Sequence, residues 1–216
     1  MIYFLGEPLS SKEVLMRQLT EEVVSCRKCS LWQSRRNPVV GEGNLNSMIM
    51  FIGEAPGYHE DIQGRPFVGA AGKLLTELLH SIGLSREDVY ITNVLKCRPP
   101  NNRDPRPEEI KACSPYLDRQ LLIIKPSIVV TLGRHATSYI LSRAGLAPRN
   151  ISSVRGKIFR LNVLGLSITL LPTYHPAAAL YRPPLRTKLE EDFNKLKSLM
   201  HERGRRSVSL EDFLKS

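Results

Sequence analysis

This chain of 216 residues has no acidic side chain over one long stretch. From Arg119 to Lys188 there are eleven Lys and Arg and no Asp or Glu. The whole chain holds 31 Lys and Arg against 21 Asp and Glu, a formal net charge of +10, so this one third carries the entire excess. A field of one sign attracts polyanions, of which nucleic acid is the commonest. The composition therefore favours a nucleic-acid partner, with a solvated basic face as the alternative.

The sequence also lacks a long apolar run and a basic leader. No run approaches the roughly 18 apolar residues that a membrane span needs, and MIYFLGEPLS has neither a basic region nor a small-residue cleavage site. We therefore expect a cytoplasmic protein with no membrane partner. Hydrophobic residues make up 42% and charged residues 24%, as in ordinary globular chains, which excludes wholesale disorder.

Cysteine is scarce, and its four copies are spaced as C-x2-C, a long gap and C-x15-C: Cys26, Cys29, Cys97 and Cys113. In a reducing compartment, two disulfides are the less favoured use of four cysteines. Four thiolates with one C-x2-C pair suit either a structural zinc ion or a [4Fe-4S] cluster, and spacing does not separate the two. Either centre would hold the proline-rich segment between Cys97 and Cys113 in one shape.

Short apolar runs alternate with helical patterns along the chain. Residues 48–52, 89–95, 128–132, 157–163 and 166–171 are typical of strands, and residues 69–81, 107–124, 134–143 and 186–200 of helices. Such alternation predicts an α/β fold, a three-layer α/β/α sandwich around a central, mainly parallel four-stranded sheet. We expect one domain over residues 1–200 and a tail over residues 201–216.

Polar segments rich in Gly and Pro follow three of the predicted strands. Ligands of parallel sheets bind beyond the carboxyl ends of the strands, so these segments should converge on one crevice. They bring together Glu54, Glu60, Asp61, Asn93, Asn102 and His175. The loop GEAPG is no dinucleotide fingerprint, because its glycines lie four apart, and a phosphate-binding P-loop is excluded by Phe67 and Leu74.

Four motifs in this order resemble one known family. GEAPGYHED-x2-GRPFVG, NVLKCRPPNNRDP, HPAAAL and the four-cysteine set are similar to the iron–sulfur (family 4) uracil-DNA glycosylases of archaea and thermophilic bacteria. The motifs span Cys26 to about Leu180. The resemblance implies a uracil-DNA glycosylase-like fold, a structural [4Fe-4S] cluster and a thermophilic source. It also implies hydrolysis of the N-glycosidic bond of deoxyuridine in single- or double-stranded DNA, as a step of base excision repair near the nucleoid.

The resemblance also suggests roles for individual residues. A base within a duplex must be flipped out to be reached. Phe67 is expected to stack on the flipped uracil, and Asn93 to match its N3 and O4 edge. Gly53 and Ala55 should line the substrate pocket. His175 is expected to face uracil O2 and stabilise the departing anion.

The carboxylate that acts near the scissile bond is not identified by the resemblance, and several groups are candidates. The best-known uracil-DNA glycosylases carry Asp where Ala55 stands here, so this role falls to Glu54, Glu60 or a backbone-held water. Glu54 is expected near the scissile bond, Glu60 is the second candidate, and Asn102 is expected to position water or phosphate.

Residues after His175 should enter the DNA groove. Leu180 or Tyr181 would replace the extruded base, while Arg182 and Arg186 would hold phosphates. Ser207, Leu210, Phe213 and Leu214 are spaced like a degenerate sliding-clamp-binding peptide, with a plain amphipathic turn as the alternative. We expect a monomer.

Two other classes of function fit parts of the sequence. One is a non-enzymatic DNA-binding protein with a four-cysteine metal module. The other is a nuclease or related hydrolase that uses Glu54, Glu60 and Asp61 with a divalent metal.

Overall fold

A central mixed sheet of six strands organises the fold, seen in a computed structural model that describes residues 10–147 and 150–206. The sheet order is β1-β3-β2-β4-β6-β5. The strands are β1 (Glu42–Gly43), β2 (Ile49–Gly53), β3 (Tyr90–Asn93), β4 (Ile128–Leu132), β5 (Phe159–Val163) and β6 (Leu166–Thr173). The neighbours β3, β2, β4 and β6 pair in parallel, whereas β1 and β5 are antiparallel edge strands. The predicted four-stranded sheet is therefore the parallel centre of a six-stranded one.

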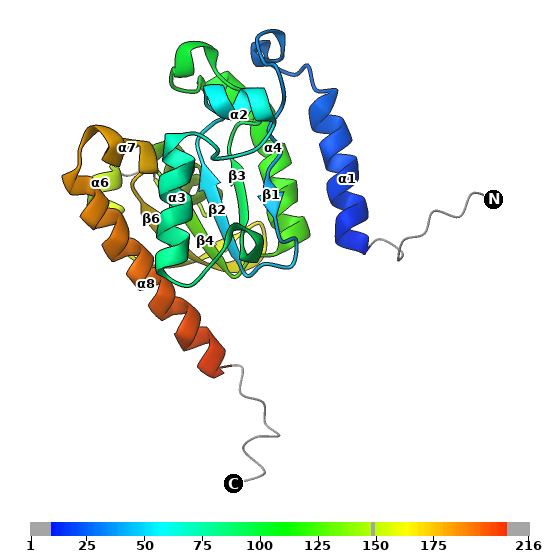
Figure 1. Cartoon of the computed structure of the whole chain (residues 1–216). Helices are drawn as coiled ribbons and strands as arrows, with labels where there is room; N and C mark the ends of the chain where they lie inside the picture. The colour runs from blue at the N-terminus through cyan, green and yellow to red at the C-terminus, as the bar shows by residue number, and fades with distance from the viewer. Residues whose placement is uncertain (1–9, 148–149, 207–216) are drawn as a thin grey trace.

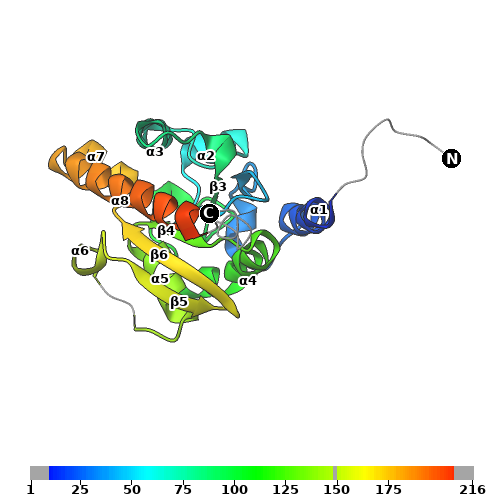
Figure 2. The ribbon, with the colours of Figure 1, turned by 90° about the horizontal axis from the view of Figure 1, so that it is seen from below.

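Helices cover both faces of this sheet (Figures 1 and 2). One face packs against α4 (Pro107–Ile124) and α5 (Arg134–Arg143), and α1 (Ser11–Val24) lies outside α4. The other face packs against α3 (Ala70–Ser81) and α8 (Pro184–Arg206). Three short helices complete the fold: α2 (Tyr58–Gln63), α6 (Ile151–Val154) and α7 (Pro176–Tyr181). The predicted three-layer α/β/α sandwich is confirmed.

Alternating side chains of the central strands enter the two cores. In β2, Met50 and Ile52 belong to the core beneath α4 and α5, whereas Ile49 and Phe51 belong to the core beneath α3 and α8. Phe51 stacks on Phe193 of α8, with ring centroids 5.7 Å apart. Because both faces are buried, these strands read as continuous apolar runs, as parallel strands do.

Local sequence sets the starts of the helices. Pro107 occupies the first turn of α4, where no N–H is needed, and the Glu109 carboxylate accepts from the Arg106 N–H at 2.8 Å. Ser10 and Glu13 form a capping box at the start of α1.

At the C-terminal end of the chain, α8 continues through Arg206, six residues beyond the predicted limit of the domain. The rest of the predicted tail, residues 207–216, lies outside the described residues. None of the described helices is long and apolar enough to cross a membrane.

Candidate active site

A pocket of about 300 Å³ lies beyond the carboxyl ends of the parallel strands. Glu54 follows β2, Asn93 ends β3, and His175 follows β6 by two residues. The sheet order reverses around β2, since the chain adds β3 on one side and β4 on the other. Such a switch point is where open α/β sheets bind ligands. The predicted residues that line the pocket are Glu54, Ala55, Glu60, Phe67, Asn93, Asn102 and His175; Gly53 lies beside them.

Phe67 is held in a strained backbone conformation inside the pocket. Its φ is 52°, a left-handed value that is rare for a bulky side chain, and the residue is 6% exposed. Arg86 donates to the backbone oxygens of Pro66 at 2.7 Å and Phe67 at 3.2 Å. A Cβ on Gly72 would lie 1.8 Å from the Phe67 oxygen, so only glycine fits beneath this turn. These contacts fix the aromatic ring as a rigid wall.

Asn93 presents an unpaired polar atom to the same space. The residue is 1% exposed, and its Oδ1 is buried without a hydrogen-bond partner. A Cβ on Gly53 would lie 2.3 Å from this oxygen and 2.6 Å from the Phe67 ring, so glycine allows the two side chains to meet here. A buried, unpaired amide oxygen is costly unless a ligand donates to it. The Asn93 oxygen is therefore available to accept a hydrogen bond from a ligand in this pocket.

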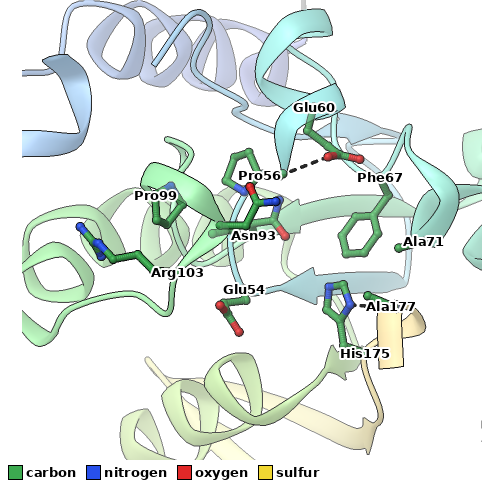
Figure 3. Close-up of a pocket in the computed structure, with 13 residues that line it drawn as sticks. Glu54, Pro56, Glu60, Phe67, Ala71, Asn93, Pro99, Arg103, His175 and Ala177 are labelled. Carbon is green, nitrogen blue, oxygen red and sulfur yellow. Dashed lines mark hydrogen bonds between the residues drawn. The ribbon is translucent and has the colours of Figure 1, made fainter. Parts of the chain in front are cut away.

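His175 is neutral and has one defined tautomer. It is the N-cap residue of α7, where its Nδ1 accepts from the Ala177 N–H at 3.1 Å, so the proton lies on Nε2. Burial lowers the pKa of His175 to about 4. Its ring stacks on Phe67 with centroids 5.5 Å apart. The other ring nitrogen faces the interior of the pocket (Figure 3), where it offers an uncharged N–H donor.

Glu54 stands across the pocket from this histidine (Figure 3). Burial raises the pKa of its carboxyl group, and the nearby His135 opposes that rise. A partly desolvated carboxylate is a stronger base and a stronger partner for positive charge than one in water. The pocket thus has a neutral donor on one side and an anion on the other.

The Glu60 carboxylate is engaged by the backbone. Its Oε1 accepts from the Val68 and Gly69 N–H groups at 2.8 and 2.9 Å, and its Oε2 accepts from Gly57 at 3.1 Å. These bonds tie the start of α2 to the loop that carries Phe67. This arrangement gives Glu60 the contacts of a residue that shapes the pocket.

Asn102 and Arg103 form the rim on the proline-rich side. Asn102 accepts from Arg98 Nε at 2.8 Å and has a φ of 53°. The Arg103 guanidinium forms a bidentate pair with the buried Glu109, at 2.9 and 2.5 Å. The rim is therefore ordered by its own side chains.

Sequence reasoning missed two residues beside Glu54. They are His135 and Asp104. The imidazole of His135 lies within ion-pairing distance of both Asp104 and Glu54. His135 follows β4 by three residues, so its place after a parallel strand was the signal that could have found it. Asp61, named for a metal-dependent hydrolase, lies elsewhere: it is 3% exposed and its Oδ1 accepts from the Arg36 N–H at 2.9 Å.

The four cysteines line a second cavity, between the end of α1, α4 and the turn after β3. None of the four forms a disulfide. Arg35 donates to Cys97 Sγ at 3.1 Å, and the Lys96 N–H donates to Cys113 Sγ at 3.2 Å. Burial raises the pKa of Cys29 and Cys97, and that of Cys113 to about 12, so binding a metal centre would release protons.

The spacing of the sulfurs argues against a single zinc ion. Tetrahedral zinc with Zn–S bonds of about 2.3 Å brings its sulfurs within about 4 Å of one another. In the described part of the chain, no three of these cysteine sulfurs lie within 4.8 Å of one another. The four sulfurs therefore do not form a closed zinc-sized set, and nothing supports the zinc alternative.

The predicted DNA-contacting residues lie on and after α7. Leu180 is 47% exposed and Tyr181 is 86% exposed. Arg182 is exposed, whereas Arg186 forms ion pairs with Glu77 and Glu190, each at 3.1 Å. His175 is the N-cap residue of α7, so this segment follows directly from a residue that lines the pocket.

Comparison with known proteins identifies the family of the chain. The profile of the uracil DNA glycosylase superfamily matches residues 40–197. The type-4 uracil-DNA glycosylase of Saccharolobus solfataricus is 56% identical over 197 residues, covering 91% of this chain and 90% of that protein. The type-4 enzyme of Sulfurisphaera tokodaii is 60% identical over 185 residues (85% and 84%), and that of Thermotoga maritima 46% over 196 residues (90% and 99%). The chain belongs to the uracil-DNA glycosylase superfamily and, within it, to the type-4 family.

Proposed function

We propose that this chain is a uracil-DNA glycosylase that hydrolyses the N-glycosidic bond of deoxyuridine in DNA and leaves an abasic site for base excision repair. The observation that carries the proposal is the buried, unpaired Asn93 Oδ1 in a pocket with Phe67 and a neutral His175. An aromatic face, an amide edge and a neutral donor are what a flipped pyrimidine requires.

Asn93 and Phe67 recognise the base. The uracil ring stacks on Phe67, whose orientation is fixed before binding by Arg86 and the close approach of Gly72. Asn93 Oδ1 accepts from uracil N3–H, and its amide nitrogen donates to O4. Cytosine presents the reversed pattern at this edge, so it would leave the buried amide unsatisfied.

His175 and Glu54 act on the bond that breaks. As the bond lengthens, negative charge moves to uracil O2, where His175 Nε2–H donates. The sugar becomes positively charged, and the ionised Glu54 stabilises it and orients the attacking water. Because His175 is neutral at pH 7, it donates a hydrogen bond without delivering a full proton to the leaving group.

Glu60 and Asn102 support these groups. Glu60 positions the Phe67 loop through its three backbone hydrogen bonds. Asn102, at the rim, orients water or the phosphate next to the uracil. Gly53 and Ala55 provide the backbone floor of the pocket.

The four cysteines hold a structural [4Fe-4S] cluster. The centre, when bound, supplies links among the N-terminal segment, the turn after β3 and α4. Lys96 supports this assignment: its buried ammonium donates to Thr92, Asn93 and Gln120 at 2.6–2.7 Å, and it forms no carboxylate ion pair in the described part of the chain. Thiolate charge beside Cys97 and Cys113 would supply the missing counter-charge.

The DNA-facing segment is α7 and its exit. Leu180 or Tyr181 fills the gap left by the flipped base, while Arg182 and Arg186 approach phosphates. The chain acts as a monomer on the DNA of the nucleoid, in single or double strands.

Residues 207–216 bind the sliding clamp. Deleting these residues should abolish co-elution with the clamp and leave uracil excision from a short oligonucleotide unchanged.

One assay tests the function and its rivals. The protein is incubated with an oligonucleotide that contains one uracil, in EDTA or in magnesium, and the product is treated with alkali. Strand breakage at uracil in EDTA, with none in matched strands bearing cytosine or thymine, is expected. Absence of product would refute the proposal and leave a binding protein, and cleavage that needs magnesium would indicate a nuclease.

A further inference from the structure

His135 lies between the carboxylates of Asp104 and of Glu54, a residue that lines the pocket. It is the second residue of α5, directly after β4, the strand that neighbours β2. Its Nε2 is 3.8 Å from Glu54 Oε2 and 3.5 Å from Asp104 Oδ1. These ligand atoms all lie within 4.8 Å of one another. The imidazole therefore joins Glu54, at the end of β2, to the loop that precedes α4.

The Nε2 atom of His135 is a buried polar atom that lacks a hydrogen bond. The imidazole as a whole is 21% exposed. Nε2 is therefore the atom through which the ring meets both carboxylates.

The surrounding charges alternate in sign. Glu54 faces His135 and, further off, Asp104 and Arg134. Arg134 neighbours His135 on α5 and pairs with Asp104 from the other side. Arg103 and His175 line the same pocket, but Arg103 is held by Glu109 and His175 is neutral. Among the described residues, His135 is the one basic side chain within ion-pairing distance of the Glu54 carboxylate.

We infer that His135 is a positioning residue for catalysis: anchored by Asp104, it keeps the Glu54 carboxylate ionised and directed toward the sugar of the flipped nucleotide. This inference rests on the proposed glycosylase function. His135 touches neither the base nor the breaking bond, and it acts only through Glu54. Burial raises the pKa of Glu54, and the interaction with His135 opposes that rise without cancelling it.

The pH dependence of His135→Gln tests this role. Without the neighbouring cation, the pKa of Glu54 should rise, and each unit lowers its ionised fraction about tenfold below that pKa. The acid limb of the profile of kcat/KM against pH should therefore move to higher pH. Arg143→Gln is the matched control: it removes a basic side chain from the same helix, but one that pairs with Asp118 and not with Glu54.

A double-mutant cycle with Glu54→Gln separates positioning from simple structural support. His135→Gln should cost about tenfold at neutral pH in the parent enzyme and almost nothing in the Glu54→Gln background. An unchanged acid limb, or an equal loss in both backgrounds, would overturn the inference. So would activity that EDTA abolishes and a divalent metal restores, because the three side chains would then be metal ligands. If the parent enzyme excises no uracil at all, the proposed function itself fails.

Discussion

His175 has two separate tasks, one for each ring nitrogen, and two substitutions can divide them. Asparagine places its oxygen near the position of Nδ1, so His175→Asn should keep the hydrogen bond from the Ala177 N–H that starts α7. It cannot reach the position of Nε2. Glutamine places its amide nitrogen near Nε2, so His175→Gln should keep the donor and lose the cap.

The two variants should therefore fail in different measurements. Loss of a donor to a developing anion costs roughly 10²- to 10³-fold in kcat, about 3–4 kcal/mol. Loss of an N-cap costs about 1 kcal/mol of folding free energy. We expect His175→Asn to show the kcat loss with near-parental stability. His175→Gln should be less stable by about 1 kcal/mol in urea unfolding and retain most of the activity.

Single-turnover excision kinetics and urea denaturation of both variants check this. If His175→Asn retained kcat within a few-fold of the parent, the role of the Nε2–H donor would be refuted. If both variants lost the same activity, the ring would matter only as packing against Phe67. Either result would remove the oxyanion assignment.

Stability against pH gives an independent check on the charge state. The folded pKa of about 4 lies below the ordinary 6.5, so the unfolded chain binds the proton first as pH falls. The preference of the unfolded chain for this proton does not affect stability above about pH 6.5. Between about pH 6.5 and pH 4 it lowers the free energy of unfolding progressively, by at most about 3 kcal/mol. His175→Asn should flatten that part of the curve. An unchanged curve would mean that His175 does not titrate in this way.

Three further results are expected. Asn93→Asp should lower kcat/KM for uracil by about 100-fold or more, because the buried edge loses its donor to O4; near-parental kinetics would remove the base-reading role. Cys97→Ser should lose bound iron and sulfide and lower the melting temperature, measured by metal analysis and thermal unfolding; full iron content would argue against a Cys97 ligand. Arg182→Ala should reduce the slope of the plot of log K for DNA binding against log salt by about one. Arg186→Ala should reduce this slope less, because Glu77 and Glu190 already neutralise the Arg186 guanidinium. Equal slopes for the two variants would contradict this difference.

The elements that the sequence predicted best are those bounded by strong local signals. The predicted α4, β4 and α5 match their observed limits, because Pro107 starts the first and Gly133 separates the other two. Helix α1 was not predicted from the sequence, although Ser10 and Glu13 form a capping-box pattern at its start. The two-residue edge strand β1 was also missed, since its pairing with β3 comes from the neighbouring strand and not from its own residues.

The pocket residues were predictable by position, but their interactions were not. Strand ends brought Glu54, Asn93 and His175 to one crevice, as the rule for parallel sheets requires. That His135 meets Glu54 depends on β4 lying beside β2, an order that no local pattern records. The left-handed Phe67 and the backbone bonds of Glu60 likewise depend on how two loops pack together.

The acid-free stretch from residue 119 to 188 does not form a bare basic surface. Six of its cations pair with carboxylates from outside the stretch: Arg119, Arg134, Arg143, Arg155, Arg186 and Lys188. The net charge of +10 still draws DNA from a distance, because a distant phosphate feels the sum of all charges. Contact at a phosphate depends instead on cations left unpaired. Within the described residues Arg182 forms no ion pair, and it follows α7, the helix that His175 caps, so we predict that Arg182 contributes more to phosphate contact than the paired Arg186.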